Sequence, residues 1–340
     1  MFSPAWKSDN PVSSPPKKKA GSGPLSIRPS WNTPPLSLLK NTVEINTIRL
    51  NEPQIHFEQY PDGRWRLPGK ATEEARQMTL KTGIFRFNIL LKKFLLNEGK
   101  VRVSNAAKEI LFAAEGVNVL GELQLLNHLN DAKGTLSIRQ LQLGSKLHFT
   151  DTRSPFEFAD SVLKLNELKG HVHGGTYEGA AQLNTGVGGP GFLLNLSLRE
   201  VDLASLLPDL SSGNNLLQGL LQLQVQLAGD LNQPLLMQGT GSMQIGRARL
   251  TGIPALDKLG TMLKLPQIRE TEFESIQGNY KVADQRVTFY ELEAKSPDLQ
   301  MTGSGFLGFD RKLDMDVLLI LSAKLAAQIP PEAPGSLFLR

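Results

Sequence analysis

The sequence predicts a mainly β protein, built as one long antiparallel meander with one or two short helices. Short segments of alternating apolar and polar residues recur along most of the chain, and Gly, Asn, Asp or Pro residues bound them. Segments with helical spacing are few. The clearest strand, residues 221–227, has Leu and Val at odd positions and Gln at even positions. This pattern is typical of a sheet with one apolar and one solvated face.

Residues 1–35 differ in composition from the rest of the chain. Eight prolines lie there among Ser, Gly and Lys, and such a segment buries too little apolar surface to offset its ordering entropy. We expect a disordered basic tail. It holds five of the 37 basic residues and one of the 33 acidic residues, which leaves 32 of each sign in the remaining 305. The balanced remainder argues against a nucleic-acid partner, which attracts clustered Lys and Arg.

The composition excludes several classes of protein. Because the chain has no cysteine, a disulfide framework, a thiolate nucleophile, Cys-ligated zinc and iron–sulfur clusters are excluded. No apolar run approaches the ~20 residues of a membrane-spanning helix. The N-terminus shows no apolar segment typical of a secretory signal.

The N-terminal part of the sheet is expected in residues 36–150. Asp62-Gly63 and Asn97-Glu98-Gly99 are expected to be tight turns, because Asp, Asn and Gly tolerate left-handed backbone. The polar residues 69–82 predict a short helix or a loop. The expected strands cover residues 44–50, 54–60, 65–67, 86–94, 99–104, 134–139 and 146–150.

The C-terminal part, residues 151–340, is expected to contain further strands and a helix near residues 255–264. Pro254 suits a first helical turn, and Pro266 ends the segment. Residues 202–210 allow at most a turn or two of helix before Pro208, and residues 320–329 fit either a strand or a helix. Four residues are expected to form one apolar helix face that caps or gates one end of the sheet: Leu256, Leu259, Met262 and Leu263.

Polar side chains that suggest chemistry are sparse. His171 and His173 would share one face of a strand, but only Glu178 offers a nearby third ligand, so we expect surface histidines and no metal. Asp314 and Asp316 fit the solvent face of a strand better than an acid–base pair. The chain has no nucleophile elbow, no phosphate-binding loop and no His-Glu-x-x-His motif. We therefore expect no catalytic residue, no cofactor and no enzymatic activity.

Apolar side chains at alternating positions are the remaining candidates for function. From alternation alone, a packed core is favoured over a ligand-binding surface. The side chains that could either face a lipid or pack in such a core are Leu136, Ile138, Leu163, Leu165, Leu221, Leu223, Val225, Leu227, Val287 and Phe289.

Several segments resemble AsmA-like proteins. Residues 47–57 followed by Asp62-Gly63-Arg64-Trp65 resemble the strand pair near the N-terminal end of that family. Residues 95–103 and 173–179 are similar to its hairpins, and residues 201–207 resemble its valine-aspartate-leucine stretch. Residues 239–305 follow the family's C-terminal region in order, and the whole resemblance covers about residues 40–325.

The resemblance implies a sheet folded into an elongated U-shaped groove with an apolar lining. The AsmA/TamB group consists of Gram-negative envelope proteins that are held by one N-terminal membrane helix, project into the periplasm and are thought to pass phospholipids toward the outer membrane. It implies a non-enzymatic protein on the periplasmic side of the envelope, associated with the inner membrane. Its partners would be phospholipid acyl chains and membrane-associated envelope proteins.

We expect this chain to lack the family's membrane anchor, because no such helix is visible in the sequence. A second hypothesis is a structural or protein-interaction β-sheet module of the cell envelope that binds no lipid.

Overall fold

The computed structural model describes most of the 340-residue chain. The expected tail at residues 1–35, the turn at Asp62-Gly63 and the helix or loop at residues 69–82 lie outside the described residues. The described residues are 42–59, 65–66, 88–126, 129–144, 146–184, 186, 191–210, 217–230, 233–252, 254–268, 271–310 and 312–330.

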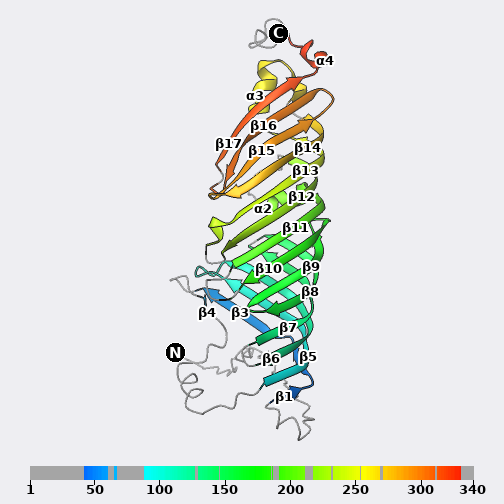
Figure 1. The fold of residues 1–340 in the computed structure, drawn as a ribbon. Coiled ribbons are helices and arrows are strands. Elements are labelled where there is room, and N and C mark those ends of the chain that lie inside the picture. The colour runs from blue at the N-terminus through cyan, green and yellow to red at the C-terminus, as the bar shows by residue number, and fades with distance from the viewer. Residues whose placement is uncertain are drawn as a thin grey trace, which may run out of the picture.

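Seventeen strands form one long open sheet (Figure 1). From β5 to β17, each strand pairs antiparallel with the strand that follows it in the chain. The predicted fold class, a mainly β antiparallel meander that forms an open groove, is confirmed. The first strands are β1 (Thr42–Ile45), β2 (Ile48–Asn51), β3 (Gln54–Gln59), β4 (Trp65–Arg66), β5 (Asn88–Ser104), β6 (Ile110–Leu126), β7 (Leu129–Leu143) and β8 (Leu147–Ala159). The others are β9 (Val162–Val172), β10 (Gly175–Asn184), β11 (Gly191–Asp202), β12 (Leu217–Asp230), β13 (Gln238–Leu250), β14 (Thr271–Ala283), β15 (Arg286–Lys295), β16 (Leu299–Gly308) and β17 (Leu313–Leu321).

The N-terminal edge departs from the antiparallel pattern. Strands β1, β2 and β3 all run parallel to β5 and pair with successive parts of it. The expected strand at residues 44–50 is therefore two strands. The breaks between the three strands lie opposite two irregular places in β5, at Lys92-Lys93 and at Glu98. A strand that bulges cannot keep a regular partner beside it, so the edge strand is interrupted at the same places.

The expected turn at Asn97-Glu98-Gly99 is wrong, because β5 runs straight through it. Glu98 has the left-handed backbone that a turn uses (φ 50°), but here it is the extra residue of a β-bulge. Left-handed backbone serves a bulge as well as a turn, so residue type alone did not distinguish them.

Bulges of this kind recur along the sheet. In each, a charged and exposed residue with φ between 50° and 58° is the extra residue at a register shift. Because a bulge bends its strand and increases the local twist, the repeated bulges curve the whole sheet. The bulged residues are Glu98, Asp151, Glu200, Arg247 and Glu291.

Three short α-helices are described rather than one or two: α2 (Leu203–Leu210), α3 (Pro254–Met262) and α4 (Ala323–Ala326). The 3-10 turns η2 (Pro234–Leu236) and η3 (Pro266–Ile268) accompany them. Contrary to expectation, α2 continues through Pro208. The ambiguous residues 320–329 divide into the end of β17 and α4, whose N-cap is Ser322. No described helix is long and apolar enough to cross a membrane.

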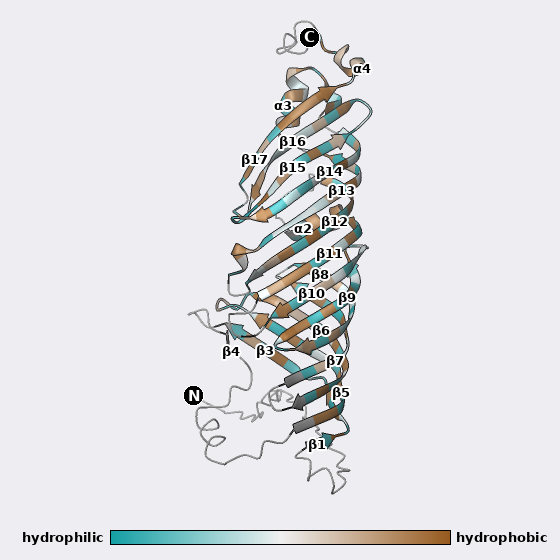
Figure 2. Ribbon diagram, viewed as in Figure 1, coloured by the Kyte–Doolittle hydropathy of each residue, from teal (hydrophilic) through white to brown (hydrophobic). Residues whose placement is uncertain are grey.

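The buried core follows one face of the sheet. Its largest cluster spans β9 to β16 and includes two residues of α2, Leu203 and Leu206. A smaller cluster lies on β6 and β7, and a third joins α3, η3 and α4 at the C-terminal end. Apolar and polar residues alternate along most strands in Figure 2. The sheet therefore has two chemically different faces.

Candidate functional site

The register of the strands shows that one face of the sheet is apolar from edge to edge. Directly paired residues of neighbouring strands point to the same face, so a row can be followed across the sheet. One such row crosses from β2 to β17 and contains only apolar residues and glycine. It runs through Ile48, Phe94, Gly121, Gly134, Phe156, Leu165, Ala181, Leu194, Leu227, Gly239, Val282, Val287, Leu307 and Leu313. We call the face that carries this row the apolar face.

The opposite face is polar. Its corresponding row from β6 to β14 runs through Asn118, Ser137, Arg153, Lys169, Glu178, Ser197, Gln224, Ser242 and Asn279. The polar face therefore meets water, and the apolar face requires a cover.

All ten strand residues that the sequence singled out lie on the apolar face. Leu165, Leu227 and Val287 belong to the row itself. Each of the other seven lies two, four or six residues from a member of the row on the same strand, so it points to the same face. Ile138 and Leu221 are buried, while the other eight remain partly accessible to solvent. The cover over this face is therefore incomplete.

Helix α2 covers the middle of the apolar face. It contacts β8, β11 and β12, and its Leu203 and Leu206 are buried there. His173 Nε2 lies 3.4 Å from Asp209 Oδ2 of this helix, and Asp202 donates its backbone N–H to the His173 carbonyl. The expectation that His171 and His173 share a strand face is wrong, because His173 lies in the β9–β10 turn with φ 45°.

Helix α3 covers the C-terminal end of the sheet. Leu256 and Leu263 are buried and Leu259 is partly buried in a cluster with α4, but Met262 is 43% exposed. The helix ends at Met262, so Leu263 belongs to the following turn. At 100° per residue, Met262 lies 120° around the helix from Leu256, which explains its exposure.

Two tyrosines place hydroxyl groups within the apolar face. Tyr177 is 4% exposed, and its hydroxyl lies 2.5 Å from Thr152 Oγ1. Burial raises the pKa of Tyr177, and the hydrogen bond with Thr152 opposes this shift. Tyr280 donates its hydroxyl to the Gln224 carbonyl at 2.8 Å, and burial raises its pKa to about 12. Both tyrosines are therefore neutral at physiological pH, as an apolar surface requires.

The ring of Tyr177 packs across the backbone of Gly170. A Cβ at this glycine would lie 2.6 Å from the tyrosine hydroxyl. Phe149 meets the same ring edge to face, with centroids 5.3 Å apart. A glycine is needed here because the tyrosine fills the space of a side chain.

Two cavities of the described chain are lined by some of the ten predicted residues. One cavity of about 1220 Å³ lies over β5 to β11 and is lined mostly by polar residues, among them Arg139, Arg153 and Lys169. Of the ten predicted residues, Leu136 and Ile138 contribute to it. A smaller cavity of about 180 Å³ lies on the apolar face, where Leu163 and Leu165 line it with residues of β10 and β11. It is below the ~300 Å³ of ordinary ligand pockets, so a long apolar ligand would have to lie along the face.

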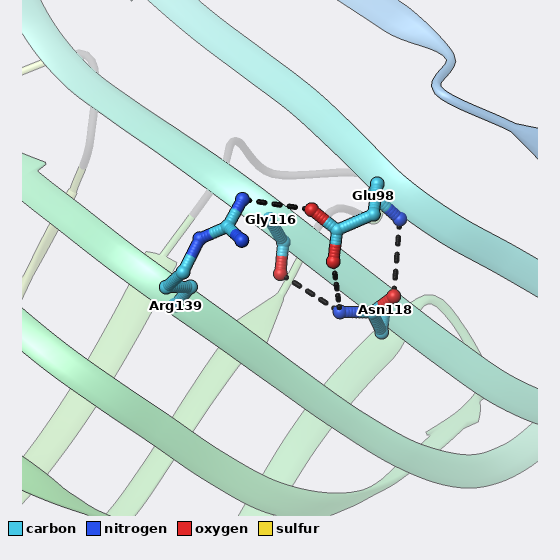
Figure 3. A network of polar contacts seen from close by, with 4 residues as sticks. All are labelled: Glu98, Gly116, Asn118 and Arg139. Atoms are coloured by element: carbon cyan, nitrogen blue, oxygen red, sulfur yellow. Dashed lines mark hydrogen bonds and ion pairs between the residues drawn. The ribbon is translucent and has the colours of Figure 1, made fainter.

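A polar network holds three strands together on the polar face (Figure 3). Asn118 accepts a hydrogen bond from the Glu98 N–H at 3.0 Å and donates to the Gly116 carbonyl at 3.0 Å. Arg139 donates to Glu98 Oε2 at 2.7 Å. Gly116 has φ +65°, and a side chain there would collide with Arg139. The network joins β5, β6 and β7 at the bulge and contains no catalytic arrangement.

Carboxylates and histidines of the described chain do not converge. Asp314 and Asp316 are exposed on β17, as expected. Among the described residues, no group of three or more His, Asp or Glu side chains is arranged to hold a metal ion.

Sequence reasoning missed the bulges, although the sequence carries a signal for them. A regular strand places the apolar residues of one face two positions apart in the sequence. At the bulge of Glu200, Leu198 and Val201 are three positions apart. At the bulge of Glu291, Phe289 and Leu292 are likewise three positions apart.

Comparisons of this chain with protein-family models, with curated proteins and with solved structures found no match.

Proposed function

We propose that this protein binds the acyl chains of phospholipids along its apolar face and serves lipid transport or outer-membrane biogenesis in a bacterial envelope, without catalysing a reaction. The observation that carries the proposal is the unbroken apolar row from Ile48 to Leu313, on a face with incomplete cover. The resemblance of the sequence motifs to AsmA-like proteins supplies the envelope setting and the periplasmic placement.

The physical basis is the hydrophobic effect. An acyl chain on this face removes its own methylene groups from water and also covers the partly exposed Leu, Val and Phe side chains, at about 0.8 kcal/mol for each buried CH₂. The apolar row is not interrupted by a charged residue, so an acyl chain that moves from strand to strand meets no charged side chain in that row. The head group would stay in water, beyond the rim of the face.

A pair of double variants on one strand tests this proposal. Leu223→Lys with Val225→Lys places two charges on the apolar face of β12, and Gln222→Lys with Gln224→Lys places the same charges on the polar face. The full-length chain and both variants are purified from a bacterial host, and bound phospholipid is measured by native mass spectrometry and lipid extraction. Circular dichroism confirms that each variant is folded.

The proposal expects phospholipid with the unaltered chain and with the glutamine variant, and at least a tenfold loss with the Leu223 and Val225 variant. Unaltered chain that carries no lipid, and takes none up from phospholipid vesicles, would refute it. Equal lipid on both variants would also refute it, because binding would then not use the apolar face.

The second hypothesis, a structural or interaction module without lipid, is favoured by the buried core cluster that includes α2. Val201 and Ala248 are fully buried in this cluster, and Phe273 is 2% exposed. This part of the apolar face is already covered by the protein's own side chains. A lipid-free, folded chain in the experiment above would put this hypothesis first.

A further inference from the structure

We infer that strand β17 is the contact through which two copies of this chain pair, edge to edge and antiparallel, into a symmetric dimer. β17 pairs with β16 on one side, and no described strand is paired with its other side. An edge strand exposes a row of unpaired N–H and C=O groups, which a second strand satisfies.

The C-terminal half of β17 lacks the residues that ordinarily protect a free edge. Charged residues or proline usually do so; the two charged residues of β17, Asp314 and Asp316, lie in its first half, and residues 317–321 contain neither a charge nor a proline. Leu313 is 66% and Val317 46% exposed on the apolar face, and Leu318 is 62% exposed on the other. Figure 2 shows hydrophobic residues along most of this strand. Apolar exposure on both faces of one edge marks a contact surface.

The sequence of β17 is complementary to itself in one register. A twofold axis at Val317 pairs all nine residues and brings apolar residues together on the apolar face: Leu313 with Leu321, Met315 with Leu319, and Val317 with its copy. On the other face, Asp314 meets Ile320 and Asp316 meets Leu318, so no like charges face each other.

Neighbouring registers are worse. An axis at Asp316 places this carboxylate opposite its copy, and an axis at Met315 places Asp314 opposite Asp316 twice. Like charges directly opposite each other destabilise a strand pair. Registers displaced toward the C-terminus pair fewer residues. Self-complementarity of one patch is what a twofold dimer requires, so the occupant of this edge is a second copy.

The dimer has a geometric consequence. The twofold axis stands perpendicular to the sheet, so the apolar faces of both copies lie on the same side and form one continuous surface. This inference rests on β17 alone and holds whether or not the apolar face binds lipid.

Single cysteine variants test the register, because the chain has no native cysteine. With the axis at Val317, the Cα atoms of the two copies of residue 317 lie about 4.5–5.5 Å apart, within disulfide range. The two copies of residue 313 lie about 26 Å apart, eight residues along the strand. Under mild oxidation we expect full-length Val317→Cys to form a covalent dimer and Leu313→Cys to form none. Equal cross-linking of both, or of neither, overturns the inference.

Charge exchange at the axis provides a second measurement. Analytical ultracentrifugation of the unaltered chain should give twice its mass of 37.3 kDa. Val317→Lys and Val317→Glu should each weaken the dimer by about tenfold or more, and their mixture should restore it as a heterodimer. Ser304→Lys adds the same charge one strand inward and should leave the dimer intact. A chain that is monomeric at 100 μM, or a mixture that stays monomeric, refutes the dimer and leaves this edge to a different protein.

Discussion

The hydrogen bond between Tyr177 and Thr152 gives the sharpest test of how the apolar face is built. The perturbation is a double-mutant cycle of Tyr177→Phe, Thr152→Val and the double variant. Both residues are nearly inaccessible to solvent, at 4% and 2% exposure, and their oxygens are 2.5 Å apart. Phe and Val keep the shapes of the original side chains, and the edge-to-face contact between Phe149 and the ring at position 177 is retained.

The magnitude follows from the cost of an unpaired buried hydroxyl. Each single variant leaves one hydroxyl without its partner, which should lower the free energy of unfolding by about 1–3 kcal/mol. The double variant removes both polar groups, so its loss should be smaller than the sum of the two single losses by about 1–2 kcal/mol. Urea denaturation followed by circular dichroism measures these differences as shifts of the midpoint at constant slope.

One result would refute this reasoning. If the two single losses simply add in the double variant, the hydroxyls are not coupled, and the tyrosine is held by packing against Gly170 and Phe149 alone. An unchanged slope in urea is the control, because it shows that the variants unfold from the same native state.

Two further predictions concern the other tyrosine and the C-terminal cluster. Because burial raises the pKa of Tyr280 to about 12, its contribution to stability is complete below pH 10 and lost as pH rises to 12. At pH 7, Tyr280→Phe should cost about 1 kcal/mol through the lost bond to Gln224. Between pH 10 and 12, the free energy of unfolding of the unaltered chain should fall by about 2 kcal/mol relative to that of Tyr280→Phe, so that the deficit of the variant disappears or reverses. Urea titrations at each pH measure this difference, and a constant difference would contradict the prediction. Leu263→Ala should lower the free energy of unfolding by about 2–4 kcal/mol, and Met262→Ala by less than about 0.5 kcal/mol; equal losses in thermal or urea unfolding would show that Met262 is not the exposed member of this helix.

The sequence predicted local features well, because they depend on residues close together in the chain. The alternation at residues 221–227 predicts one apolar side of a strand, and β12 shows it. All ten candidate residues share one face for the same reason: a period of two assigns each apolar residue to a side before any pairing is known.

Features that depend on distant partners were missed. Nothing in residues 42–59 indicates that β1, β2 and β3 run parallel to β5, because that pairing joins residues about 46 positions apart. The bulge at Glu98 was read as a turn, since both use left-handed backbone. α2 passes through Pro208, where local propensity predicted an end, and its buried residues Leu203 and Leu206 anchor it to the sheet.

The strand order of this sheet makes the molecule nearly one-dimensional in its energetics. From β5 onward, each strand has its main contacts with the strands before and after it in the chain, so stability is close to a sum of neighbouring strand–strand terms. Under a pulling force on the C-terminus, such a sheet should release its strands in sequence from β17 inward. Helix α2 is the exception, since it bridges β8 to β11 and β12. Sequential release should therefore pause when it reaches β12, and the strands from β8 to β12 should separate only at a higher force.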